Sequence, residues 1–146
     1  MSKFTLATLS QWAQQTQARM DAIVKGSTQE VCRIAQTIDD DGGRLPYDLG
    51  TLRGSFQSSL NGDVAGEGED SYELVVGKME AGDVAHFEWT VEYAARMNYG
   101  FVGEDKLGRE YNQQGTFFLE GATMQWQNIV SMETSKAQIA VGKNTR

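Results

Sequence analysis

The segment LSQWAQQTQARMDAIVKGSTQEVCRIAQTI, residues 9–38, decides the fold. Its apolar and small residues recur at alternating steps of three and four, which is the period of an α-helix. The residues of this stripe are Leu9, Trp12, Ala13, Thr16, Met20, Ile23, Val24, Ser27, Val31, Ile34, Ala35 and Ile38. No proline interrupts the pattern, and Thr8 or Ser10 can serve as the N-cap. We therefore predict a single long N-terminal helix.

This helix is long for the domain that contains it. At about 1.5 Å per residue, some thirty residues span roughly 45 Å, whereas a compact domain of this length has a radius of gyration of only about 15 Å. Two interpretations follow. Either Gly26 and Ser27 divide the helix into two segments, because glycine costs a helix about 1 kcal/mol, or the apolar stripe is partly covered by something outside this chain.

Three segments with a period of two follow the helix. Residues 52–60 and 72–77 alternate apolar with polar side chains, and the glycine-rich, acidic segment 61–71 joins them. This arrangement predicts a β-hairpin with a long tip. Residues 85–93 show the clearest alternation, with one apolar and one polar face. We predict an antiparallel sheet of three strands or more, with an extended hairpin and one buried face.

The C-terminal third predicts a second long helix. After the sheet, the chain passes through a short helix or turn at 93–101 into a polar loop that ends at Gly115. Thr116 can cap a helix that continues to Gly142 and Lys143. Its apolar face carries Phe118, Ala122, Trp126, Ile129 and Val130. The predicted fold class is α+β, as one domain over residues 1–146 with an N-terminal arm (1–8), mobile loops (61–71 and 101–115) and a free tail (143–146).

Composition and charge exclude several classes of protein. Of the 146 residues, 40% are apolar and 23% are charged, which fits one globular domain with a core. Thirteen Lys and Arg against twenty Asp and Glu give a net charge of -7, so we expect no specific nucleic-acid binding. No segment matches a membrane span or a signal peptide. The single cysteine agrees with a reducing compartment, and we expect a soluble cytoplasmic protein.

Nothing in the sequence supports catalysis, a metal site or a cofactor. His86 is the only histidine and lies on the polar face of a predicted strand, so we interpret it as a surface or interface residue. Cys32 lies in the middle of the long helix, where it is a small core residue. The glycines at 62, 66 and 68 lack the flanking strand and helix of a nucleotide loop. We expect a protein that is not an enzyme.

An aromatic group near the C-terminal helix has two interpretations. The helical spacing of Trp126, together with Phe117, Phe118 and Leu119, is typical of core residues. Alternatively, these side chains line a pocket for an apolar ligand. The second interpretation corresponds to a small cytoplasmic ligand-binding or interaction domain.

The segment LPYDLGTLRGSF, residues 45–56, predicts a fixed turn between the long helix and the first strand. Pro46 restricts one backbone angle, and Gly50 permits a left-handed conformation. Asp48 can accept backbone N–H bonds within the turn or pair with Arg53. We interpret Pro46, Asp48 and Gly50 as a brace within the protomer, and Arg53 can instead reach an acidic partner.

The same segment resembles a motif in the minor tail, neck and tail-completion proteins of long-tailed bacteriophages. In that family, the motif follows the first long helix and combines a proline, an aspartate, a glycine and a Leu-Arg pair. The matching residues are Pro46, Asp48, Gly50, Leu52, Arg53 and Ser55. Leu49 stands where the family usually has a threonine.

Two further blocks of sequence extend the resemblance. EYAARMNYGF, residues 92–101, is similar to the family's Tyr-Ala pair followed by an aromatic residue and a glycine, here Tyr93, Ala94 and Gly100. GTFFLEGATMQW, residues 115–126, is similar to the family's entry into the last helix at Phe118, without the prolines usual beside it. The three blocks stand in the family's order.

The resemblance implies a structural component of the virion at the head-to-tail junction or in the tail. Such a protein forms a ring of identical copies around the DNA channel and contacts neighbouring neck or tail proteins, with no role for a membrane. We expect six copies, because tails of this type are six-fold, with twelve as the alternative. During assembly it would be found in the host cytoplasm.

A ring also explains features of the sequence. In a ring, one surface of each subunit meets a different surface of the next, which would cover the long helical stripe. An acidic wall would repel phosphates and let DNA slide. We expect the segments 61–71 and 101–115 to contact neighbouring rings. The candidate interface residues are Trp12, Met20, Glu67, Glu69, Asp70 and Trp126.

Overall fold

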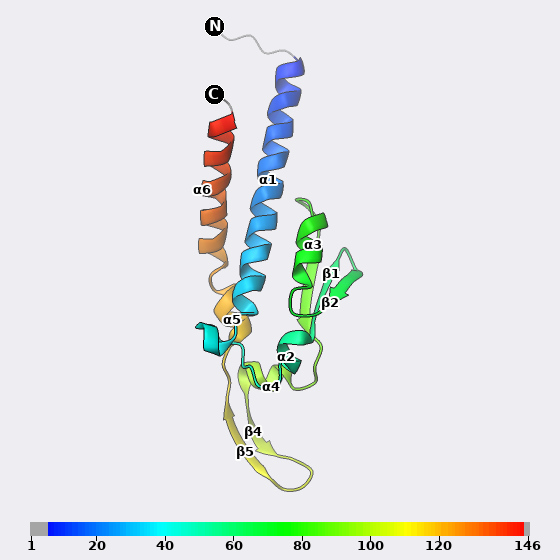
Figure 1. Ribbon diagram of the computed structural model, residues 1–146, viewed down its shortest axis with the longest axis vertical. Helices are drawn as coiled ribbons and strands as arrows, with labels where there is room; N and C mark the ends of the chain where they lie inside the picture. Colours follow the sequence, from blue (N-terminus) through cyan, green and yellow to red (C-terminus); the bar gives the residue numbers. More distant parts are fainter. Residues whose placement is uncertain (1–5, 145–146) are drawn as a thin grey trace.

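The computed structural model describes the backbone of residues 6–144 and the side chains of residues 8–139. The molecule is elongated, and its helix α1 (Leu6–Ala35) lies between α6 (Trp126–Asn144) on one side and α3 (Tyr72–Lys78) on the other (Figure 1). A three-stranded antiparallel sheet packs beside α3. The predicted α+β class, with a long helix at each end of the chain and a three-stranded sheet, is confirmed.

Helix α1 is continuous through Gly26 and Ser27, so the alternative of two segments is wrong. The side chain of Glu133 on α6 lies against Gly26, where a Cβ would overlap its carboxylate. The helix begins at Leu6, inside the expected arm 1–8, and α6 continues to Asn144, inside the expected tail 143–146. Residues 1–5 and 145–146 lie outside the described part of the chain.

The sheet has the order β2-β1-β3. Strand β1 (Phe56–Leu60) pairs with β3 (Ala85–Trp89) from Phe56 opposite Trp89 to Leu60 opposite Ala85. Strand β2 (Asp63–Glu67) pairs with the other edge of β1. The turn between β1 and β2 is Asn61-Gly62, with φ of 52° and 88°. Asn-Gly is the strongest short signal for a tight hairpin, so the sequence marks a turn here where we expected a long loop.

The segment 72–77, expected to be a strand, is helix α3, so the hairpin partner of β1 is β2 within the expected loop 61–71. Tyr72, Val75 and Met79 are buried at helical spacing. Short apolar runs fit both periods, and here packing against α1 and β1 favours the helix.

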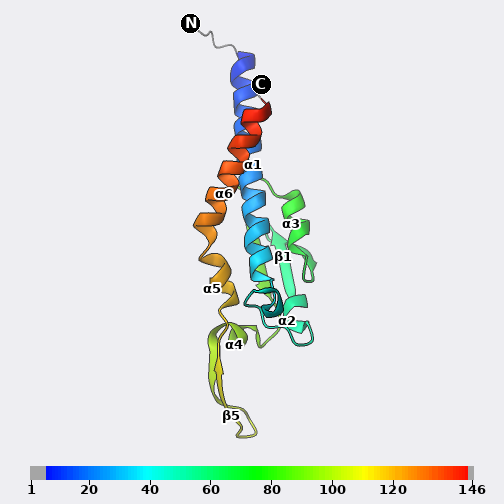
Figure 2. The same ribbon diagram turned by 60° about the vertical axis from the view of Figure 1, so that its left-hand side comes forward.

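The prediction of a loop over residues 101–115 is also wrong, because the chain forms a second hairpin there. Strand β4 (Gly100–Glu104) pairs with β5 (Glu110–Gln114) in a two-stranded sheet that projects from the end opposite the tip of α1 (Figure 2). Its tip is held by Asp105, which accepts hydrogen bonds from the backbone N–H groups of Leu107 and Arg109, each at 2.9 Å.

The C-terminal helix is shorter than expected and has a short helix before it. Helix α5 (Phe118–Thr123) packs against α1 and is separated from α6 by Met124 and Gln125. Thr116 is not the N-cap. That position belongs to Phe117, whose φ of 53° lies in the left-handed region. The remaining short helices are η1 (Asp39–Asp41), α2 (Thr51–Gly54) and α4 (Ala94–Tyr99).

Candidate functional site

Residues from the three sequence blocks pack into one apolar cluster. Leu45 and Leu52 from the first block and Phe118 from the third are buried together, with Ala94 and Met97 from the second packed against them. The ring of Phe118 meets Trp89 edge-on, with centroids 4.8 Å apart. The structure therefore brings together segments that lie far apart in the sequence, at the point where the turn, α4 and α5 meet.

Arg53 connects the motif turn to the end of α1 through Gln36, which is 2% exposed. The Nε of Arg53 donates to the backbone carbonyl of Gln36 at 3.0 Å, and its Nη1 lies 2.9 Å from the carboxylate of Glu69. Of the two alternatives for Asp48, its pairing with Arg53 is therefore wrong. Glu69, a candidate interface residue, forms an ion pair within its own chain, and half of its side chain stays exposed.

The Gln36 side chain joins three segments. Its Nε2 donates to the backbone carbonyls of Arg53 and Glu69, each at 3.0 Å, and its Oε1 accepts from the Trp89 indole N–H at 2.7 Å. It thus ties the end of α1 to the motif turn, to the segment before α3 and to β3. Gln36 was not predicted, because a single glutamine at the end of a helix carries no sequence signal for this role.

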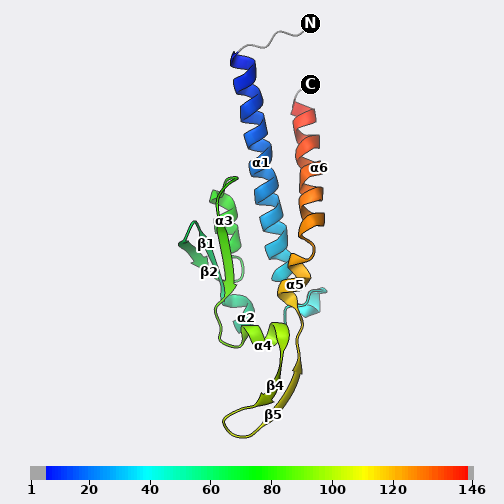
Figure 3. The same ribbon diagram turned by 180° about the vertical axis from the view of Figure 1, so that it is seen from behind.

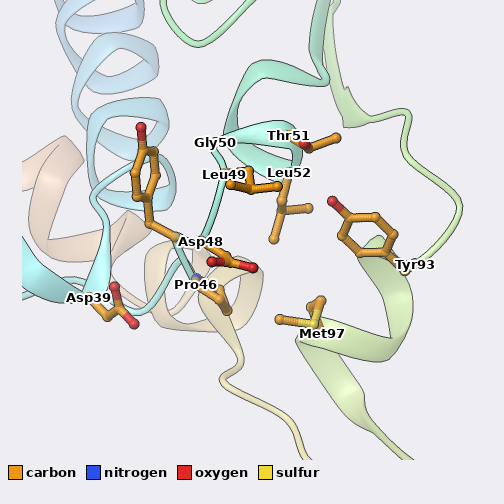
Figure 4. A pocket seen from close by; sticks show the side chains of 10 residues that line it. Asp39, Pro46, Asp48, Leu49, Gly50, Thr51, Leu52, Tyr93 and Met97 are labelled. Carbon is orange, nitrogen blue, oxygen red and sulfur yellow. The ribbon is translucent and has the colours of Figure 1, made fainter.

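The motif turn and α4 enclose a shallow cavity of about 210 Å³. Asp39, Pro46, Asp48, Tyr93 and Met97 are among the residues that line it (Figure 4). The turn needs Gly50, whose φ is 79°. The carboxylates of Asp39 and Asp48 at this open depression suit the docking of a polar or basic side chain.

Gly100, from the second block, lies at the base of the projecting hairpin. Its φ is 88°, and a Cβ would come within 2.6 Å of the carbonyl oxygen of Gln113. Beside it, the buried Asn98 donates to the Glu120 carboxylate at 2.8 Å and accepts from the backbone N–H of Leu119 at 3.0 Å. These contacts tie α4 to α5 and fix where the hairpin leaves the body.

The other interface candidates lie on the surface. Trp12 and Met20 are 66% and 49% exposed on α1, and Glu67 and Asp70 are exposed beside the sheet. The interpretation of Trp126 as a core residue is wrong, because its side chain is 44% exposed at the start of α6.

The four aromatic and apolar residues considered as a pocket do not form one together. Phe118 is buried in the core, whereas Phe117 and Leu119 are exposed. A separate apolar cleft of about 150 Å³ lies between α1, α5 and the sheet, with Phe56, Phe87 and Leu119 in its wall. Ligand sites usually measure about 300–1,000 Å³, so this cleft is small for one.

His86 and Cys32 lie in different surroundings. His86 lies on the exposed face of β3, 3.6 Å from Glu88. Cys32 is buried, and desolvation raises the pKa of its thiol to about 12, so the thiolate is scarce at neutral pH. Within residues 8–139, no three His, Cys, Asp or Glu side chains gather in a way that could hold a metal ion.

Across the described helices, none combines the length and the apolar character that a membrane span requires. The chain matches no protein-family model, no curated protein and no solved structure.

Proposed function

We propose that this protein is a non-enzymatic structural component of the neck or tail of a long-tailed phage, of the tail-completion or head-to-tail joining kind. In this proposal, identical copies form a ring around the DNA channel. Six copies are expected and twelve are the alternative. The ring contacts neighbouring neck or tail proteins.

The packing of the three sequence blocks carries the proposal. A resemblance spread over separate blocks has structural meaning only if the blocks belong to one unit. Leu52, Ala94 and Phe118, one from each block, share the apolar cluster at the junction. This supports the view that the blocks form one unit rather than three chance matches.

The distribution of exposed apolar residues supports a ring. Leu9, Trp12 and Met20 continue the helical stripe that is buried farther along α1, yet they face solvent. Soluble monomers rarely leave large contiguous apolar surface uncovered. The net charge of -7 fits a channel through which DNA passes without adhering.

The test is the mass and shape of the purified full chain over a wide range of concentration. We expect ring-shaped particles with a central hole in electron micrographs and a native mass that is a multiple of the protomer mass, six-fold or twelve-fold. A strict monomer that a small apolar compound stabilises against heat would contradict the proposal. That result would favour a ligand-binding domain that uses the cleft beside Phe87.

A further inference from the structure

The turn between β1 and β2 carries the only Asn-Gly pair of the sequence, Asn61-Gly62. Both residues are exposed, and both have a left-handed φ, which asparagine and glycine adopt more readily than other residues. A Cβ at Gly62 would meet nothing within 4 Å. The peptide unit between the two residues is therefore open to solvent.

An asparagine loses its side-chain amide most readily when a glycine follows it. The backbone nitrogen of the glycine attacks Cγ of the asparagine, an N–Cγ bond forms, and the side-chain nitrogen leaves as ammonia with the proton of the attacking nitrogen. One water molecule then opens the resulting succinimide ring at either carbonyl, which yields aspartate or isoaspartate. Glycine favours this reaction because it has no side chain to hinder the close approach of its backbone.

The side chain of Asn61 is held toward the beginning of β3. Its Nδ2 donates to Oδ1 of Asp83 at 3.1 Å, and its Oδ1 accepts from the backbone N–H of Val84 at 2.9 Å. We call these two hydrogen bonds the Asn61 clamp. Strand β1 lies between β2 and β3, so the amide is turned to the β3 side, whereas Gly62 leads the chain to the β2 side. The clamp must therefore open before the nitrogen of Gly62 can reach Cγ.

Asp83 is also held by the segment that contains it. Its Oδ2 accepts from the backbone N–H of Glu80 at 2.8 Å, and this hydrogen bond and the one from Asn61 lower the pKa of Asp83, so the carboxyl is ionised at neutral pH. In the same segment, the backbone N–H of Ala81 donates to the Asp21 carboxylate at 2.8 Å. The clamp thus connects the β1–β2 turn to α1, on the side of α1 where α3 and the sheet lie (Figure 3).

We propose that Asn61 is a deamidation site under the control of this clamp, because the reaction proceeds only when the clamp opens and its product keeps the clamp from closing. Aspartate or isoaspartate at this position has no side-chain N–H to donate to Asp83. Its carboxylate would instead face the Asp83 carboxylate at close range, where like charges repel. Deamidation would therefore release the turn from the segment 79–84 irreversibly. This inference does not depend on the proposed ring.

Peptide mass spectrometry of the full chain, incubated in mildly alkaline buffer, tests the site. We expect aspartate and isoaspartate to accumulate at Asn61 ahead of Asn112, which is also exposed but is followed by Gln113. Conversion of Asn61 should be faster in denaturant, where the clamp is absent, than in the folded protein. Conversion of Asn61 no greater than that of Asn112 would overturn the site, and equal rates in the folded and unfolded chains would overturn the control by folding.

Two substitutions at Asp83 test the clamp. Asp83→Ala removes the acceptor and should speed the conversion of Asn61 in the folded protein about two- to tenfold, the factor that corresponds to one hydrogen bond of ordinary strength. Asp83→Asn keeps an oxygen at Oδ1 and is the matched control, so its rate should stay close to that of the original chain. Circular dichroism and thermal melting confirm that each variant is folded. An unchanged rate in the folded Asp83→Ala variant would overturn the role of the clamp.

The effect of the product is measured on the variant Asn61→Asp. Hydrogen–deuterium exchange over the segment 79–84 should be about two- to tenfold faster than in the original chain, because the clamp is lost. Combining Asn61→Asp with Asp83→Asn exchanges the amide and the carboxylate, so a hydrogen bond between the two side chains can form again and protection should return. Unchanged exchange in Asn61→Asp, or no recovery in the combined variant, would overturn the proposed effect of deamidation.

Discussion

The two halves of α1 carry one stripe but have different surroundings. In the C-terminal half, Ser27, Cys32 and Ala35 are buried against α3, α5, α6 and the sheet. In the N-terminal half, Leu9, Trp12 and Met20 occupy the same stripe and are exposed. A periodic pattern thus predicts a helix and its apolar face, but it does not indicate how much of that face the rest of the chain covers.

The N-terminal half also lacks the usual support of an exposed helix. Residues 6–18 contain no charged side chain, so no ion pairs four residues apart stabilise this stretch. Substitutions should therefore cost more stability in the packed part of the molecule, around the C-terminal half of α1, than in the exposed N-terminal half.

Phe56→Ala should destabilise the protein by about 3–5 kcal/mol, the usual cost of removing a buried aromatic ring. Phe56 is fully buried with Cys32 and Tyr72, and its ring stacks on Phe87 at 5.7 Å between centroids. Chemical denaturation followed by circular dichroism measures the loss. Leu49→Ala, at a side chain that is 86% exposed, is the control and should change stability little. Equal losses of stability in the two variants would contradict the placement of Phe56 in the core.

Gln36→Leu should cost about 2–3 kcal/mol, because similar volume is kept while buried donors and acceptors lose their partner. The Trp89 indole N–H and the carbonyls of Arg53 and Glu69 would be left unpaired. Denaturant unfolding gives the change, and Asp48→Asn, at an exposed position in the turn, should be neutral. If Asp48→Asn lowered the free energy of unfolding more than Gln36→Leu does, Asp48 would be the brace of the turn and Gln36 would not.

Gly26→Ala should stabilise the protein by up to about 1 kcal/mol, because alanine is the better helix former. The new Cβ overlaps only the end of the Glu133 side chain, which can rotate away. Thermal melting measures the change, and the same substitution in a Glu133→Ala background should give the full gain. Destabilisation in both backgrounds would mean that the α1–α6 crossing cannot adjust.

Trp12→Ala should change the stability of the monomer by less than about 0.5 kcal/mol, as is usual for exposed positions. Its side chain has little contact within the chain. If the N-terminal half is covered by neighbours in a ring, the same substitution should weaken assembly, measured as native mass against concentration. An unchanged assembly curve would remove Trp12 from the interface.

The parts of the fold with long or strict periods were predictable. The periodicities of residues 9–38 and 85–93 identified a helix and a strand, because one buried face imposes the period, but the helix ends at Ala35 and the strand at Trp89. Segment 72–77 was mispredicted as a strand because so short a segment fits both periods, and tertiary packing decided for helix α3. The β4–β5 hairpin escaped notice because its exposed strands carry no alternating apolar face.

The candidate site was predicted only in part. Its turn was correctly placed by Pro46 and Gly50, whose backbone constraints are local. The partners of Arg53 were not predictable, because Gln36 and Glu69 meet it only after the chain folds. Trp126 follows the helical spacing but stands where α5 ends and α6 begins, so the expected continuous apolar face is interrupted there.

The arrangement of the two long helices has a practical consequence. Helix α1 begins, and α6 ends, at the pole of the molecule opposite the β4–β5 hairpin (Figure 1). A gold particle or fluorescent protein fused to either terminus would therefore mark the same pole. In micrographs of any particles that the protein forms, such a label would reveal which way the subunits point.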